Sequence, residues 1–157
     1  MNEKIKVHTP LQALAKIQDW CAYHERCQQE VRDKLYNYGL HQGDVENIIS
    51  KLIADNYVNE ERFAKAYVGG KFRIKKWGRS KIKAGLRSKK ISEYCMKKAF
   101  EEINDKEYAK TLRKLLENKS KLLPERNAVR RKYKLLSYAA SKGYEQGLIM
   151  EILNEDI

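Results

Sequence analysis

The sequence predicts an all-α protein made of three tandem three-helix repeats that form an elongated, curved array. The first reason is composition, because long stretches rich in Lys, Glu, Leu and Ala are interrupted by only two prolines, Pro10 and Pro124. Proline is the residue that most strongly disrupts a helix interior. The second reason is the lack of strand signals, since no convincing alternation of β-branched and polar residues and no Asn-Gly or Asp-Gly hairpin pair occurs.

The third reason is an internal repeat. The segment YGLHQGDVENIISKL, which begins at Tyr38, reappears 104 residues later as KGYEQGLIMEILNED, which begins at Lys142. An intermediate copy, KKISEYCMKKAFEEI, lies about halfway between them. A repeat of this length predicts three units of three helices each. Because such units contact only their neighbours, we expect the contacts between repeats to supply much of the stability.

The first repeat is predicted to span residues 9–58. Thr9 is a suitable N-cap and Pro10 suits the first helical position, so a helix is expected over LQALAKIQDWCAYH. A second helix, CQQEVRDKLYNY, is followed by Gly39, which tolerates the positive φ of a helix end. A third helix covers GDVENIISKLIADN. The residues expected in the core are Leu14, Ile17, Cys21, Cys27, Val31, Leu35, Tyr38, Val45, Ile48, Ile49, Leu52 and Ile53.

The second and third repeats are predicted to span residues 59–104 and 105–157. Asn59 and Asn104 supply helix caps at the two boundaries. The repeats differ in charge: residues 1–58 carry 7 basic and 8 acidic groups, the second repeat carries 14 and 5, and the third carries 12 and 8. Three quarters of the net charge of +12 therefore belongs to the second repeat.

A basic tract occupies residues 71–90 of the second repeat, with ten Lys or Arg residues and no acid. We expect most of these cations to be exposed and to bind a polyanion or an acidic protein. The alternative is a solvated face that only keeps the protein soluble, but such a face would mix charges of both signs. The predicted partner-binding residues are Lys71, Arg73, Lys75, Lys76, Arg79, Lys81, Lys83, Arg87, Lys89 and Lys90.

Apolar residues are interleaved with these cations at spacings that a helix can bury, which predicts a folded segment and not a disordered tail. They are Phe72, Ile74, Trp77, Ile82 and Leu86. Phe72 and Trp77 suit stacking on bases, but their position beside Ile74 favours the core. Gly69 and Gly70 interrupt a helix at a cost of about 1 kcal/mol each relative to Ala. They indicate either close approach of a partner or tight packing between helices, and the sequence leaves both open.

Neither a membrane segment nor a signal peptide is expected. No apolar run approaches the roughly 18 residues that a spanning helix needs, and the N-terminus MNEKIKVHTP lacks the apolar region of a signal peptide. Cys21, Cys27 and Cys95 are odd in number and form no CxxC pair, which is typical of a reducing compartment. A cytoplasmic protein with free thiols is therefore expected. We also expect it to be a monomer.

The sequence favours a protein that is not an enzyme and has no metal or cofactor. Cys21, His24 and Cys27 follow at intervals of three, but a helix break near Glu25 and the lack of a clear fourth ligand argue against zinc. The Gly-Arg-Ser run that begins at residue 78 lacks the GK[ST] of a phosphate-binding loop. Two pairs of adjacent glutamates lie at expected helix ends, Glu60 with Glu61 and Glu101 with Glu102. Because neighbours in a helix point to different faces, these pairs suit capping better than acid–base catalysis.

Four segments, in order and spacing, resemble the RecX regulatory proteins of bacteria. They are CAYHERCQQEVRDKLYNYG, LIADNYVNEERFAKAYV, GRSKIKAGLRSKKIS and SKGYEQGLIMEIL. The resemblance extends from about Leu11 to Leu153, and NYVNEERFAKAYV is its most specific part. Two positions depart from the family pattern: Cys27 replaces a frequent Ser at a helix cap, and Lys90 replaces a frequent Gly after a helix.

The resemblance implies a crescent of three helical repeats that binds the RecA recombinase. RecX-like proteins lie in the groove of the RecA filament on single-stranded DNA and inhibit its growth, ATP hydrolysis and strand exchange. They thereby modulate DNA recombination, repair and the SOS response, and they are not enzymes. The departures at Cys27 and Lys90 weaken a predicted cap and a predicted helix end, respectively.

Two classes of function therefore remain. The first is a regulator that binds a nucleoprotein filament, and the second is a direct, non-specific binder of single-stranded or double-stranded DNA. Helix-turn-helix readout of a sequence is disfavoured, because the helices that would enter the groove carry acids that repel phosphate. These acids are Asp44, Glu46, Glu145 and Glu151.

Overall fold

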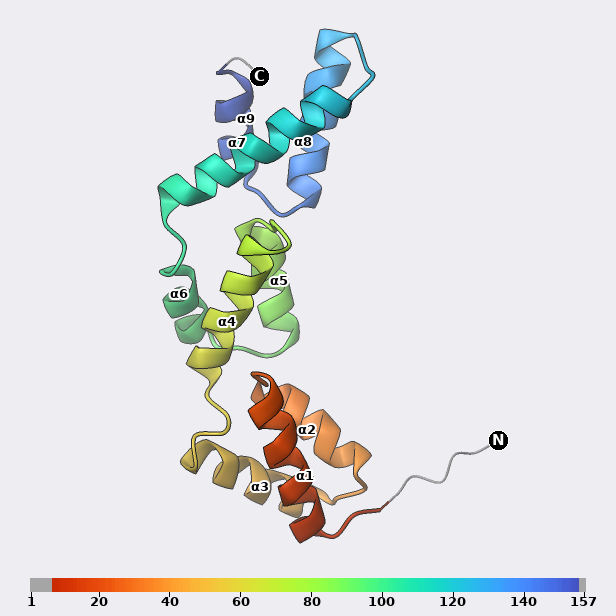
Figure 1. Cartoon of the computed structure of the whole chain (residues 1–157), viewed down its shortest axis with the longest axis vertical. Coiled ribbons are helices and arrows are strands. Elements are labelled where there is room, and N and C mark those ends of the chain that lie inside the picture. The colour runs from red at the N-terminus through yellow and green to blue at the C-terminus, as the bar shows by residue number, and fades with distance from the viewer. Residues whose placement is uncertain (1–6, 156–157) are drawn as a thin grey trace, which may run out of the picture.

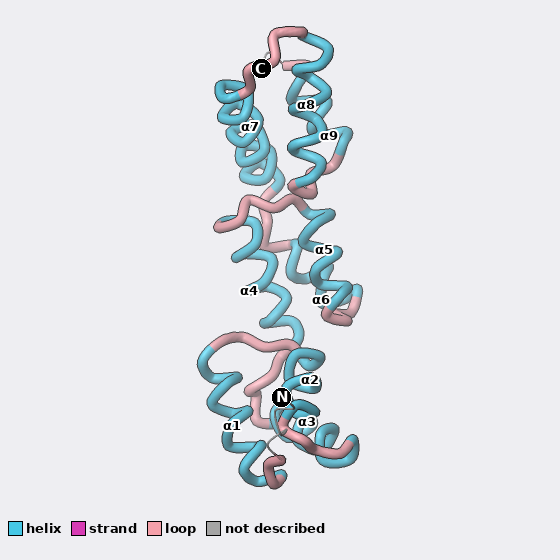
Figure 2. Tube along the Cα trace, turned by 90° about the vertical axis from the view of Figure 1, so that its right-hand side faces the viewer, coloured by secondary structure: helices cyan, strands magenta, loops and turns pink. Residues whose placement is uncertain are grey.

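The computed structural model describes residues 7–155, and within them the chain forms nine α-helices and no strand (Figures 1 and 2). The helices follow one another in three sets along the long axis of an elongated molecule. This arrangement confirms the predicted all-α fold of three tandem three-helix repeats. The helices are α1 (Pro10–Tyr23), α2 (Gln28–Asn37), α3 (Gln42–Ala54), α4 (Glu60–Arg73), α5 (Arg79–Ser88), α6 (Glu93–Phe100), α7 (Asp105–Leu122), α8 (Ala128–Ser141) and α9 (Gln146–Leu153).

The first helix of each set begins at a side-chain cap. The Thr9 hydroxyl accepts a hydrogen bond from the backbone of Gln12, and Asn59 accepts one from the backbone of Arg62 at 2.9 Å. Asn104 caps α7 in the same way. Each cap satisfies an N–H group that has no partner inside its helix. The caps expected from the sequence therefore form, while a division into separate folding units at residues 58 and 104 stays a prediction.

The middle helix of each set ends in the same Schellman turn. The residue after the C-cap has positive φ in all three cases: Gly39 at 84°, Lys90 at 58° and Gly143 at 101°. The next residue then donates its N–H to a carbonyl in the last turn, in the bonds Leu40 to Leu35, Ile91 to Leu86 and Tyr144 to Ala139. The turn therefore forms even where Lys90 replaces glycine, although a side chain in this conformation costs about 1–2 kcal/mol.

Two apolar cores run through the molecule. One is confined to α1–α3 and its linker, and the other is continuous through the second and third repeats and also takes in Cys27 of the first. Phe72 is buried and Trp77 is partly buried against the larger core, as the sequence favours. The continuity means that the second and third repeats stabilise each other by packing.

Two expected core residues are exposed. Ile53 is 44% exposed and Ile74 is 78% exposed. Ile53 directly follows the buried Leu52, and successive residues of a helix point about 100° apart. Ile74 is the C-cap of α4 and lies two residues beyond Phe72, which occupies the core side of that helix. Both isoleucines therefore lie on the solvent side of their helices.

We predict that Lys90→Gly stabilises the protein by about 1 kcal/mol, because glycine adopts positive φ without the steric cost of a Cβ. For a chain of this length the melting temperature should rise by about 2–4 °C in a circular dichroism melt. Lys90→Ala is the matched control, since it removes the same side chain but keeps the Cβ. An equal effect of the two substitutions would show that the strain at this turn is not the cause.

Candidate partner-binding surface

The basic tract covers the end of α4, the following loop, all of α5 and the turn after it. Lys71 and Arg73 are on α4, and Lys75 and Lys76 are in the loop. The remaining cations are on or after α5: Arg79, Lys81, Lys83, Arg87, Lys89 and Lys90. The residues thus belong to one continuous segment of the second repeat, and they differ in what each side chain contacts.

Four of these cations pair with acids from other elements. Lys89 lies 3.6 Å from Glu30 of α2, and both side chains are partly buried. The pair of Arg73 with Glu107 (3.7 Å) is about half exposed, and that of Arg87 with Glu93 (3.5 Å) is largely exposed to solvent. Exposed ion pairs contribute little to stability. Arg73 and Arg87 can therefore exchange their carboxylate for that of a partner. The fourth paired cation is Arg79.

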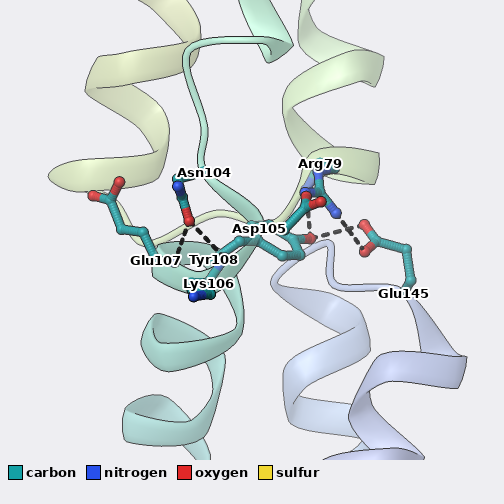
Figure 3. Close-up of polar contacts among 7 residues, drawn as sticks. All are labelled: Arg79, Asn104, Asp105, Lys106, Glu107, Tyr108 and Glu145. Carbon is teal, nitrogen blue, oxygen red and sulfur yellow. Dashed lines mark hydrogen bonds and ion pairs between the residues drawn. The ribbon is translucent and has the colours of Figure 1, made fainter.

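Arg79 joins the second repeat to the third (Figure 3). Its guanidinium lies 2.6 Å from Asp105 and 3.3 Å from Glu145, and stacks 3.8 Å from the centre of the Tyr108 ring. The Tyr108 hydroxyl accepts the backbone N–H of Arg79 at 3.0 Å and donates to Glu145 at 2.7 Å. Burial raises the pKa of Tyr108 well above its usual value, so the hydroxyl keeps the proton that it donates. Arg79 therefore has a structural role at this junction, which the sequence did not indicate.

The backbone closes the same junction. The N–H groups of Gly78 and Ser80 donate to the carbonyls of Lys142 (2.8 Å) and Gly143 (3.0 Å), and the Tyr144 hydroxyl donates to the Lys76 carbonyl. A Cβ on Gly78 would overlap the backbone of Gly143. Only glycine fits at this close approach.

The junction between the first and second repeats is held by side chains. Glu60 accepts the backbone N–H of Gln28 at 2.6 Å, and Arg62 pairs with Glu25 at 2.5 Å. Burial raises the pKa of Glu60, and the Gln28 N–H opposes that shift. Within residues 7–155, no hydrogen bond between main-chain atoms connects these two repeats. Their contact is therefore less tightly constrained than the contact between repeats two and three.

Trp77 is covered by two lysines of the basic tract. The ammonium groups of Lys71 and Lys81 lie 4.8 Å and 4.4 Å from the centre of its ring. Such cation–π contacts stabilise both partners. Since lysines cover its ring and its other side packs on the core, Trp77 does not present a free platform for a base.

Four cations of the basic tract have neither a carboxylate within ion-pair distance nor an aromatic ring beneath them in the part of the chain that the structure describes. These unpaired lysines are Lys75, Lys76, Lys83 and Lys90, and all but Lys83 are exposed. Lys76 and Lys90 also have positive φ. These four lysines can therefore bind a partner without giving up an ion pair or a ring contact, and the role of all ten cations in partner binding stays a prediction.

The cysteines show no arrangement suited to metal binding. Cys21 and Cys27 are buried while His24 is exposed, and no group of three potential ligands gathers among residues 7–155. Burial raises the pKa of Cys21 to about 11 and that of Cys27 to about 12, which keeps both thiols protonated near neutral pH. The Cys27 sulfur accepts the backbone N–H of Glu30 at 3.5 Å, so it still caps α2. None of the helices in the described region has the length and apolar character needed to cross a membrane.

Comparison with known proteins gives the family. Residues 59–99 match the family model described as RecX, second three-helix domain. Regulatory protein RecX of Bacillus mycoides is 27% identical over 98% of this chain and 55% of its own length. That of Clostridium perfringens is 31% identical over 76% of this chain and 57% of its own length. The chain thus spans little more than half the length of these relatives.

The chain belongs to the RecX family. The crystal structure of RecX from Lactobacillus salivarius has the same fold, with a TM-score of 0.84 at 23% identity over 93% of this chain and 95% of that one. The two departures noted from the family pattern, Cys27 and Lys90, leave the helix cap and the helix end in place. The matched segment, residues 59–99, includes the whole basic tract.

We predict that Tyr108→Phe destabilises the protein by about 1–3 kcal/mol. The change removes one hydroxyl and leaves the Glu145 carboxylate and the Arg79 N–H without their buried partner. Urea unfolding followed by circular dichroism measures the loss. Tyr94→Phe is the control, because Tyr94 is 64% exposed. Equal stability of the two variants would contradict a structural role for the Tyr108 hydroxyl at this junction.

Proposed function

We propose that this RecX-family chain binds the RecA recombinase filament on single-stranded DNA and restrains its growth, ATP hydrolysis and strand exchange. The observation that carries the proposal is the similarity to regulatory RecX proteins along 98% of the chain. The protein acts by binding, as a regulator of DNA recombination and repair, and carries out no chemical step itself. Its elongated fold supports contact with an extended partner, because it presents a long surface for its mass.

The unpaired lysines supply the electrostatic part of this binding. A RecA filament on DNA offers phosphates and protein carboxylates, and charges that have no internal partner gain most from either. Lys75, Lys76 and Lys90 are exposed, so their ammonium groups stay hydrated in the free protein and are accessible to a partner. Arg73 and Arg87 add to this surface when their exposed ion pairs exchange. We leave Arg79 out of this surface, because its guanidinium already pairs with Asp105 and Glu145 between the repeats.

Direct binding of nucleic acid is the second candidate, and a different surface favours it. The turn between α7 and α8 and the adjoining helix ends, residues 119–134, carry 7 basic groups and 1 acid. Tyr133 is 69% exposed there, and Arg126 and Arg130 are exposed as well. Cations beside an exposed aromatic ring suit a single-stranded polyanion. The sequence pattern does not single out this turn, because the third repeat as a whole is less basic than the second.

We predict that changing Lys75, Lys76, Lys83 and Lys90 together to Glu weakens filament binding by at least about tenfold and leaves the fold intact. If all four contact phosphates, the slope of log K against log salt becomes shallower by roughly 3. Fluorescence anisotropy with host RecA, single-stranded DNA and a slowly hydrolysed ATP analogue measures the affinity and its dependence on salt. The charge-matched control changes Lys16, Lys106, Lys110 and Lys114, which are exposed and outside the tract.

Two further measurements distinguish RecA regulation from direct DNA binding. Wild-type affinity for bare single-stranded DNA equal to that for the filament would favour direct DNA binding over RecA binding. ATP turnover is measured with and without RecA, and turnover by the protein alone above a no-protein blank would contradict a purely regulatory role. Full inhibition of RecA by the four-lysine variant at moderate salt would move the binding surface to another part of the molecule.

A further inference from the structure

A groove of about 480 Å³ opens at the junction between the first and second repeats. This volume is in the range of pockets that bind ligands. One wall is formed by His24, Glu25 and Glu30, at the end of α1 and on α2. The other wall is formed mainly by α4 and the residue that caps it: Phe63, Ala66, Tyr67, Gly70, Lys71 and Ile74.

The residues of the second wall form one stripe along α4. Their spacing alternates between three residues and one, which places them on a single helix face. From Phe63 to Ile74 the stripe extends about 16 Å at 1.5 Å per residue. Ala66 is exposed and Ile74 is 78% exposed. This is the pattern of a helix face that packs on another helix, and no other element of residues 7–155 covers these two positions.

Gly70 lies in the middle of this stripe. Glycine inside a helix costs about 1 kcal/mol relative to Ala, yet α4 continues without a break from Glu60 to Arg73. A Cβ placed on Gly70 would meet no atom within 4 Å beyond its own helix and chain neighbours. Within the described part of the chain, no close packing therefore requires glycine at this position. What the missing side chain provides is room for another molecule to approach the backbone of α4 closely.

The charges at the groove favour an acidic occupant. Its two acids are already neutralised, since Glu25 pairs with Arg62 at 2.5 Å and Glu30 pairs with Lys89 at 3.6 Å. Lys75 is one of the unpaired lysines, and Lys71 contacts the rings of Tyr67 and Trp77. The uncompensated charge along the groove is therefore positive.

We propose that this groove binds an amphipathic helix of the partner protein whose apolar face is flanked by carboxylates. Apolar side chains of that helix pack on Ala66, Gly70 and Ile74, and its carboxylates pair with Lys71 and Lys75. A helix laid in a groove is a common mode of peptide recognition, with anchors at helical spacing. The identity of the partner rests on the proposed function, whereas the chemistry of the occupant rests on the groove.

Gly70→Leu tests the proposal with the full chain and the RecA filament. Leucine projects into the groove and favours helix, so the melting temperature should be maintained or rise. Filament affinity should fall at least about tenfold. Gly147→Leu is the matched control, because Gly147 is also helical, lies outside the groove, and has open space where a Cβ would stand, with no atom within 4 Å. Filament binding by Gly70→Leu as tight as that of wild type would overturn the proposal.

A second arm does not depend on RecA. A designed helical peptide with Leu on one face and Glu on its flanks is titrated into wild-type protein, and amide NMR shifts are followed. We expect shifts centred on the amides of Ala66, Gly70 and Ile74. These shifts should disappear in Gly70→Leu, and they should not occur with a peptide that carries Lys in place of Glu. No shifts at these amides, or equal shifts with the Lys peptide, would overturn the groove proposal even if the filament binds. Peptide binding without filament binding would support the groove and refute RecA as the partner.

Discussion

The contact of Arg79 with Tyr108, Asp105 and Glu145 decides how the second and third repeats are placed. It combines ion pairs, a stacked guanidinium and a hydroxyl that accepts one hydrogen bond and donates another, and it lies beside the close approach of Gly78 to Gly143. These interactions depend on one another, because the residue whose ring supports the guanidinium also accepts the Arg79 N–H. The shared apolar core behind them turns two repeats into one unit.

The first repeat is attached differently. It has its own core, and its contacts with the second repeat are made by side chains such as Glu60 and Arg62 and by the buried Cys27. No main-chain hydrogen bond crosses this junction among residues 7–155, and the groove along α4 lies there. The tight junction and the open one thus have different roles: one fixes the shape of the array, and the other exposes a helix face.

The packing of the repeats also determines which cations of the basic tract are paired. The basic tract contains no acid, yet the fold brings Glu30, Glu93, Glu107 and Glu145 to it from four other places in the sequence. The partly buried pair of Arg79 with Glu145 serves the fold, while exposed pairs such as that of Arg87 with Glu93 remain open to exchange. The molecule keeps its positive character through Lys75, Lys76, Lys83 and Lys90, and through the turn between α7 and α8.

The sequence by itself determined the helical class, the three repeats, the caps at Thr9, Asn59 and Asn104, and the helix end at Gly39. These features depend on neighbours within a few residues, or on periodicity, and both are written in the chain. It also favoured a place in the core for Phe72, which the structure confirms. Only the tertiary structure decided the role of each cation, because a salt bridge such as Arg79 with Glu145 joins residues 66 positions apart. For the same reason it alone showed Ile74 exposed and Gly70 beside open space, since the surroundings of a helix face depend on what packs against it.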